Sequence, residues 1–166
     1  MAITVRSAEL TDTPALALLR WRWRSEERGE VGLSRDQFVE AFAGWMSEHR
    51  ESHLVWLAQT DQDPIGMAWL AVIHRVPGPG HWLRLSGNLQ SVYVIPEHRG
   101  SGAGELLVRA VVDRAHVLGL EYISVHPSER SFSLYRRWGF AEYSGVLELR
   151  WDGRTTRPRS APPTSA

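Results

Sequence analysis

A glycine-rich turn, Arg99-Gly100-Ser101-Gly102-Ala103-Gly104, lies between an alternating apolar segment and a helical one. The first amides of a helix have no partner within the helix, and the helix dipole adds partial positive charge beside them. Glycines let the backbone approach phosphate oxygens closely. The turn therefore predicts an anion site with Arg99 at its edge, although its glycine content equally fits a plain connection between a strand and a helix.

The spacing of the glycines excludes two common kinds of phosphate site. The dinucleotide pattern G-x-G-x-x-G would need a glycine at position 105 or 107, where the chain has Glu105 and Leu107. The loop that binds nucleoside triphosphates needs Gly-Lys followed by Ser or Thr, and this turn contains no lysine. Any phosphorylated ligand of the turn must therefore belong to another class.

The elements that position this turn follow from hydrophobic periodicity and turn residues. We expect strands over residues 3–6, 53–59, 65–76, 88–95, 122–125 and 146–151, and helices over 14–24, 35–49, 104–118 and 129–138. The order β-α-α-β-β-β-α-β-α-β predicts a mixed α/β fold built on a mostly antiparallel sheet flanked by helices.

Three helix starts carry capping signals. Thr13 followed by Pro14 is typical of an N-cap with proline at the first helical position. Ser34 and Gln37 have the spacing of a capping box, and Ser128 precedes the last helix. The segment 25–33, with two glycines, breaks the helical pattern and is predicted to be a loop.

Length and composition bound the class of protein. The chain has 166 residues, which suits one domain, predicted over 1–152. Residues 153–166 have almost no large apolar side chain and predict a disordered tail. The 19 acidic and 19 basic residues balance, so no nucleic-acid partner is expected. No apolar run approaches a membrane span or a signal peptide, so we expect a cytoplasmic protein without a membrane partner.

Metal and thiol chemistry are not expected. The chain contains no cysteine, which excludes a cysteine nucleophile, a disulfide and a thiolate metal site. Its seven histidines are scattered without H-E-x-x-H spacing, so the sequence predicts no metal site.

The basic and aromatic stretch 20–24 suggests contact with a polyanion or a membrane. At helical spacing, however, Trp23 continues an apolar face formed by Leu16 and Leu19. Three nearby glutamates, at positions 26, 27 and 30, offset the arginine charges. A core helix with flanking cations is therefore the favoured interpretation.

The segment 92–107 resembles motif A of the GNAT family, the GCN5-related N-acetyltransferases. The family pattern Q/R-x-x-G-x-G/A is matched by Arg99, Gly102 and Gly104. A second block at 128–140 is similar to the family pattern N-x-x-A-x-x-x-Y-x-x-x-G-F, with Ser128 and Ser131 in place of asparagine and alanine. Both blocks together make the resemblance specific over 88–140.

The resemblance implies a site for acetyl-CoA and gives each matched residue a role. The backbone of Val92, Tyr93 and Val94 should pair with the pantetheine arm as an added strand would. Ser128, with Ser131 beside it, should approach the pantetheine or the phosphates, and Tyr135 should lie near the thioester sulfur. The amides of the turn should hold the pyrophosphate; they belong to Gly100, Ser101, Gly102, Ala103, Gly104 and Glu105.

The implied reaction is direct attack of a primary amine, most simply a small molecule, on the acetyl thioester. A backbone N–H near Val94 would polarise the carbonyl, and Tyr135 would donate a proton or a hydrogen bond to the sulfur. The general base is left open between Glu27 or its neighbour Glu26, His126 and a water relay, with Gln90 and Ser91 as further acceptor contacts.

Several alternatives stay open from the sequence. The acceptor could be a protein N-terminus or a lysine side chain, and the chain could instead be a CoA-binding sensor or scaffold without catalysis. A nucleotide-binding enzyme is a further alternative, and a homodimer is compatible with the sequence. Trp56, Trp69 and Trp82 either line an acceptor pocket or belong to the core.

Overall fold

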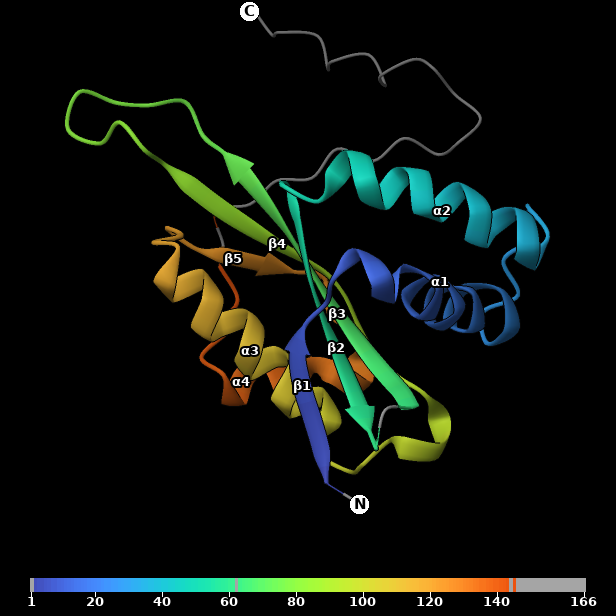
Figure 1. Ribbon diagram of the computed structural model, residues 1–166. Coiled ribbons are helices and arrows are strands. Elements are labelled where there is room, and N and C mark those ends of the chain that lie inside the picture. Colours follow the sequence, from blue (N-terminus) through green and yellow to red (C-terminus); the bar gives the residue numbers. More distant parts are fainter. Residues whose placement is uncertain (1, 62, 144, 146–166) are drawn as a thin grey trace, which may run out of the picture.

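A five-stranded sheet forms the centre of the protein in the computed structural model, which describes residues 2–61, 63–143 and 145 (Figure 1). The strands follow one another across the sheet in chain order. The first three pairings are antiparallel, and β4 pairs with β5 in parallel. The strands are β1 (Ile3–Ser7), β2 (His53–Thr60), β3 (Asp63–His74), β4 (Leu85–Val94) and β5 (Ile123–Val125).

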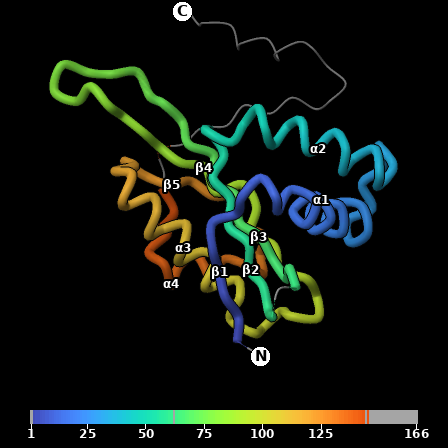
Figure 2. Tube along the Cα trace, in the orientation of Figure 1, coloured from blue at the N-terminus to red at the C-terminus, as the bar shows by residue number. Residues whose placement is uncertain are grey.

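Two pairs of helices cover opposite faces of this sheet (Figures 1 and 2). The first pair, α1 (Thr13–Trp21) and α2 (Arg35–His49), connects β1 to β2, and a π-helical segment (Arg22–Glu26) extends α1. On the other face, α3 (Ala103–Val117) makes the crossover from β4 to β5, and α4 (Phe132–Arg137) follows β5. Short 3₁₀ turns precede α1, α3 and α4, at Leu10–Asp12, Pro96–His98 and Glu129–Ser131.

Each face of the sheet has its own hydrophobic core. On the α3 side, Leu70 and Leu89 pack against Leu107 and Val111 of the helix and against Tyr135 of α4. On the α1 side, a second set of buried residues packs between the sheet and helices α1 and α2. That set contains Leu16, Leu19, Met46, Val55, Leu57, Met67, Trp69 and Tyr93. The helices on both faces are thus fixed to the same central strands.

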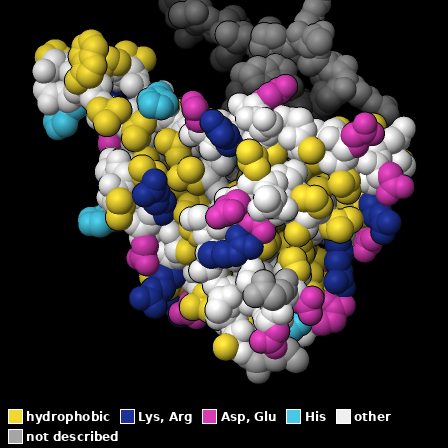
Figure 3. Space-filling view, viewed as in Figure 1, with side chains coloured by type: hydrophobic (Ala, Val, Ile, Leu, Met, Phe, Trp, Pro, Cys, Tyr) yellow, Lys and Arg dark blue, Asp and Glu magenta, His cyan; other side chains and the backbone are white. Residues whose placement is uncertain are grey.

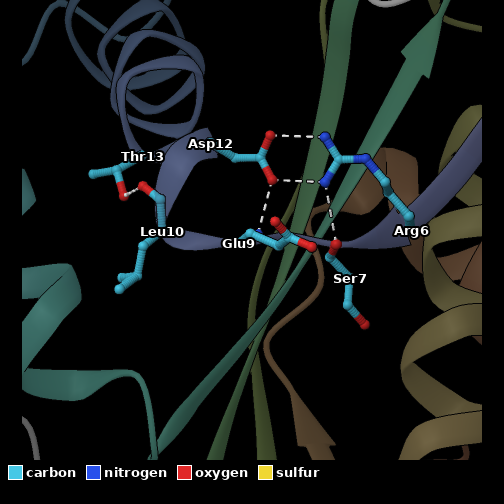
Figure 4. Close-up of polar contacts among 6 residues, drawn as sticks. All are labelled: Arg6, Ser7, Glu9, Leu10, Asp12 and Thr13. Carbon is cyan, nitrogen blue, oxygen red and sulfur yellow. Dashed lines mark hydrogen bonds and ion pairs between the residues drawn. The ribbon is translucent and has the colours of Figure 1, made fainter.

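The start of α1 is fixed by a compact polar turn (Figure 4). Arg6 of β1 donates two hydrogen bonds to the Asp12 carboxylate, at 2.6 and 2.7 Å. The same carboxylate accepts the Glu9 amide at 2.8 Å, and the Thr13 hydroxyl donates to the Leu10 carbonyl at 2.6 Å. The guanidinium contact lowers the pKa of Asp12, since it stabilises the ionised carboxyl. The direction of α1 across the sheet is set at this turn.

The predicted fold class is confirmed, with local corrections. Asp12 rather than Thr13 is the N-cap of α1, so Pro14 takes the second helical position. The helix also continues as the π-helical segment to Glu26, where a loop was predicted from position 25. Ser34 does cap α2, and its capping box with Gln37 is present. The predicted last helix is instead a 3₁₀ turn followed by α4, and the Ser128 side chain makes no cap bond.

The connection between β3 and β4 forms an arm that projects from the body of the protein (Figures 1 and 2). Its side chains include apolar residues that are open to solvent: Val76 is 82% exposed, Trp82 85% and Leu83 71%. Apolar side chains gather at the end of this arm in the space-filling view (Figure 3). Trp82 is therefore not a core residue, whereas Trp56 and Trp69 are buried in the two cores.

Some predictions concern residues that the structure does not describe. The strand expected over 146–151 and the tail expected over 153–166 both lie outside the described residues. Among the described residues, no helix combines the length and the apolar character that a membrane crossing requires. The described part of the chain also contains no group of three or more His, Cys, Asp or Glu side chains placed to hold a metal ion.

Candidate functional site

The glycine turn has a backbone conformation that only glycine adopts easily. Gly100 and Gly102 have φ angles of +78° and +89°, in the left-handed region. No atom beyond the chain neighbours lies within 4 Å of a Cβ built at either position, so backbone conformation and not space requires glycine. The two residues turn the chain from the 3₁₀ turn after β4 directly into α3.

The N-terminus of α3 presents unbonded amides. The first helical bond runs from the Leu106 amide to the Gly102 carbonyl at 3.1 Å, and the N-cap residue Gly102 has no side chain to cap the helix. The amides of Ala103, Gly104 and Glu105 therefore have no intrahelical acceptor. With the helix dipole, they form a site suited to a phosphate group.

Gly104 lies where this site meets α4 and β4. Its backbone is ordinary, and a Cβ there would lie 3.8 Å from Leu134 and 3.9 Å from Val94, which are normal contact distances. The protein itself thus leaves room for alanine at this position.

A bulge in β4 separates this strand from β5. Trp69 of β3 pairs with Ser91 while Leu70 pairs with Leu89, so Gln90 is an additional residue. Beyond Leu89, which pairs with Val125, the described part of β5 offers no further partner. Pro127 follows two residues later and has no N–H to continue a ladder. The two parallel strands therefore diverge from Gln90 onward.

Among the described residues, the far half of β4 consequently has an open edge. The Ile95 amide, just after β4, donates to the Ile65 carbonyl of β3 at 2.9 Å. Because alternate residues of a strand direct their N–H and C=O groups to opposite edges, Val92 and Val94 direct theirs away from β3. Arg99 Nε donates to the Val94 carbonyl at 3.1 Å on that side. An extended ligand could pair with the remaining groups.

Tyr135 lies on the same side of the sheet as the glycine turn. It is 6% exposed and packs in the α3 core, with its ring edge against Phe140 at 5.4 Å between centroids. Burial raises the pKa of Tyr135 to about 12, so the hydroxyl stays protonated throughout the neutral range. The side chain is thus a hydrogen-bond donor and a weak acid.

Ser128 and Ser131 lie at the start of the turn that leads into α4. Their hydroxyl oxygens are 3.0 Å apart, and the Ser131 hydroxyl also donates to the Ser128 carbonyl at 2.9 Å. Ser128 is exposed and can offer its hydroxyl to a ligand. Their predicted contact with a cofactor stays a prediction.

A polar network on the opposite face joins Glu27, Tyr93 and Arg99. The Tyr93 hydroxyl donates to one carboxylate oxygen of Glu27. Arg99 Nη2 donates to the other oxygen at 2.5 Å. The guanidinium of Arg99, which the sequence placed at the edge of the phosphate turn, is therefore engaged with Glu27 and Val94. The network ties the segment after α1 to the start of the glycine turn.

The pKa values in this network follow from its contacts. Burial opposes the ionisation of Glu27, but the hydrogen bonds from Tyr93 and Arg99 and the charge of Arg99 outweigh it, so the pKa of Glu27 is lowered. Burial and the neighbouring Glu27 carboxylate raise the pKa of Tyr93. Glu27 is therefore ionised at neutral pH, and the Tyr93 hydroxyl stays protonated and donates its hydrogen bond.

The structure brings Gln90 and His126 to one place. Leu89 and Val125 form the last pair of β4 and β5, and Gln90 and His126 are the next residue of each strand. Both are exposed, at the point where the strands diverge. Their predicted contact with an acceptor stays a prediction, as does that of Glu27.

Sequence reasoning did not find how the basic stretch 20–24 meets this site. Arg20 Nη1 donates to the Ser91 hydroxyl of β4 at 2.7 Å. Trp23 stacks on Tyr93 with ring centroids 5.6 Å apart and planes 16° from parallel. Contacts between segments 71 positions apart leave no local signal in the sequence.

The comparison with protein families identifies the class. The model of the acetyltransferase (GNAT) family matches residues 15–140, and the chain belongs to this family. The match extends from α1 to the residues just after α4, so it contains both the glycine turn and the open edge of β4. A comparison with curated protein sequences found no significant match.

Solved structures share the fold at low sequence identity. A predicted acetyltransferase from Clostridium acetobutylicum, solved with acetyl-CoA, superposes with a TM-score of 0.73 at 20% identity, covering 90% of this chain and 96% of that one. A GCN5-related N-acetyltransferase from Ralstonia eutropha gives 0.69 at 22% identity, with coverages of 90% and 99%. Glucosamine-6-phosphate N-acetyltransferase from Arabidopsis thaliana gives 0.67 at 14%, with coverages of 92% and 100%. At these identities the likeness concerns the fold.

Proposed function

We propose that this protein transfers an acetyl group from acetyl-CoA to the primary amine of a small molecule. One observation carries the proposal: the unbonded amides after Gly102 and the open edge of β4 lie next to each other on one side of the sheet. Together they suit a ligand that has phosphates followed by an extended amide-bearing arm, which is the chemistry of CoA.

The residues present fit such a ligand. The amides of Ala103, Gly104 and Glu105 would hold the pyrophosphate, and the outward groups of Val92 would pair with the pantetheine amides, while the Val94 amide would face the thioester. Glycine at positions 100 and 102 keeps the amides in place. Acetyl-CoA would supply the thioester whose acetyl group is transferred.

In the reaction, one bond forms, one bond breaks and one proton is transferred. The neutral amine forms a C–N bond to the carbonyl carbon, the C–S bond breaks, and the proton lost from nitrogen balances the one gained by the thiolate. The amide of Val94, on the open edge, would stabilise negative charge that develops on the carbonyl oxygen.

Tyr135 would serve the sulfur as a hydrogen-bond donor. Its raised pKa, about 12, makes full proton transfer to a thiolate unfavourable, since a thiol has a pKa of about 8.5. A hydrogen bond needs no such transfer and still stabilises the leaving thiolate.

Glu27 is a poor choice of general base, because two donors already hold its carboxylate and its pKa is lowered. A water at the divergence of β4 and β5, near Gln90 and His126, would take the amine proton instead.

The test is release of free thiol from acetyl-CoA across a panel of small amines and peptides, with calorimetric titration of CoA beside it. We expect CoA binding and turnover on a subset of small amines. Binding without turnover on any amine would overturn the enzymatic proposal in favour of a CoA-binding module. Turnover restricted to peptide N-termini or lysine side chains would overturn the small-molecule acceptor.

A further inference from the structure

Several arginines surround one tryptophan on the α1 side of β4. Three guanidinium carbons lie close to the Trp23 ring centroid: Arg20 at 5.2 Å, Arg28 at 5.4 Å and Arg24 at 5.9 Å. The indole also stacks on Tyr93. Each guanidinium is attracted to the aromatic ring, but like charges this close repel one another unless anions compensate them.

Carboxylates compensate some of these arginines and not others. Arg24 pairs with Glu30 at 2.5 Å, and two further arginines of the region are paired, Arg22 with Glu97 and Arg99 with Glu27, each at 2.5 Å. Within the part of the chain that the structure describes, Arg20 and Arg28 have no carboxylate within ion-pair distance. Glu26 also has no ion pair there, but its charge acts on Arg22 rather than on Arg20.

Arg20 differs from the other arginines around Trp23 in its surroundings. Its side chain is half-buried against the sheet, and its hydrogen-bond partner is the neutral Ser91 hydroxyl. Burial, and then the charge of Arg24, lower its pKa, while Glu30, already bonded to Arg24, acts in the opposite direction. A cation that is partly removed from water without a counter-ion costs free energy in the folded protein. An anionic ligand would offset that cost.

The position of Arg20 connects it with the reaction. Ser91 lies two residues beyond the last pair of β4 and β5, so Arg20 reaches the point where the strands diverge. It does so from the α1 face, whereas the amides of α3 lie on the opposite face (Figure 1). The phosphates of CoA and a ligand of Arg20 therefore occupy different sides of the sheet.

We infer that the acceptor amine carries an anionic group, a carboxylate or a phosphate, and that Arg20 binds this group while Arg28 adds charge beside it. The inference rests on the proposed function and deepens it by giving the chemical class of the acceptor. After donating to Ser91, the guanidinium of Arg20 keeps further N–H groups for a planar anion.

The test uses pairs of related acceptors that differ in charge. One arm compares L-amino acids with their α-carboxamides, and the other compares O-phosphoethanolamine with ethanolamine. We expect kcat/KM to be about 10-fold to 100-fold higher for the anionic member in at least one arm, the range of a charge-assisted hydrogen bond. The α-ammonium group of an amino-acid amide loses its proton more easily than that of the amino acid. This difference favours the uncharged member of the pair, so it works against the expected result. Equal kcat/KM within every pair would overturn the inference.

Variants of Arg20 test whether this residue causes the preference for the anionic acceptor. Arg20→Gln should remove it while the KM for acetyl-CoA stays unchanged, and Arg20→Lys should restore part of it. Arg24→Gln is the matched control, because Arg24 lies beside the same indole but already has Glu30 as a partner. A preference that survives Arg20→Gln, or an equal loss for both members of each pair, would overturn the role of Arg20.

Anion binding can be measured even if the protein acetylates no amine. If no amine is acetylated, calorimetric binding of the same pairs to the CoA-saturated protein still tests the anion site. Binding of the anionic member alone, lost in Arg20→Gln, supports the inference; equal or absent binding of both members overturns it.

Discussion

The two sides of β4 are built in different ways. On the α3 side, the site consists of backbone: amides at a helix N-terminus and the open edge of a strand, all within residues 92–105. On the α1 side it consists of side chains, and the contacts of Glu27 with Tyr93 and Arg99 join positions 66 and 72 apart.

This difference separates recognition of a ligand that the whole family shares from recognition of an acceptor that is particular to this protein. Backbone groups recognise phosphates and amides with little dependence on side-chain identity, which suits a ligand that a whole family shares. Side-chain charge and shape decide which acceptor fits, and these depend on how distant segments pack. Changes on the α3 side should therefore affect CoA, and changes on the α1 side should affect the acceptor or local stability.

The largest effect is expected for Gly102→Val. A β-branched residue at φ +89° costs about 1–3 kcal/mol or moves the amides of α3, so CoA should bind about 100-fold more weakly. Gly119→Val is the control, because Gly119 follows the other end of α3 with φ +69°. Both variants should lose stability in thermal unfolding, but only the first should lose CoA affinity in calorimetry. Equal affinities would contradict a phosphate site at this turn.

Tyr135→Phe should lower kcat about 10-fold or more while the KM values change little, because the hydroxyl acts on the leaving sulfur. With a pKa raised to about 12, Tyr135 is protonated at every working pH. The wild-type profile of kcat against pH should therefore show no alkaline loss from this group below about pH 11. An unchanged kcat in the variant would exclude the proposed role.

Gly104→Asp should separate CoA affinity from stability. The new Cβ meets the protein only at ordinary distances, and a carboxylate in the first turn is favoured by the helix dipole, so the free energy of unfolding should stay level or rise by up to about 1 kcal/mol. CoA affinity should fall about 10-fold, because the carboxylate repels the phosphates. Gly44→Asp in α2, also in open space, should leave affinity unchanged. Affinity that survives Gly104→Asp would place the phosphates elsewhere.

Glu27→Gln should have the smallest effect, a loss of about 1 kcal/mol in unfolding free energy at pH 7. The folded-state pKa of Glu27 is lowered, so its stabilisation is present above the unfolded value of about 4.3 and is lost as pH falls through the folded value. Denaturant titrations should show the gap to wild type closing below about pH 4. Glu26→Gln, which removes an exposed carboxylate that has no ion pair with any described residue, should show no such pattern.

Much of the α3 side could be predicted from the sequence. The turn at 99–104, the helix after it and the block at 128–140 were recognised from types and spacing, because left-handed glycines and helix starts are local features. The bulge at Gln90 was not predicted, although it separates β4 from β5. A bulge depends on which residues of two strands face each other, and an isolated strand does not show that.

The α1 side was decided by tertiary structure. From the sequence, the stretch 20–24 indicated a core face with flanking cations, and Glu27 was one loop residue among several. Packing of α1 and its π-helical extension on the sheet places Arg20 against Ser91 and Glu27 between Tyr93 and Arg99. The sequence by itself determined the glycine turn and the start of the helix after it, because these features belong to contiguous backbone. Only the tertiary structure decided which arginines lack a carboxylate partner among the described residues, because charge compensation depends on groups distant along the chain.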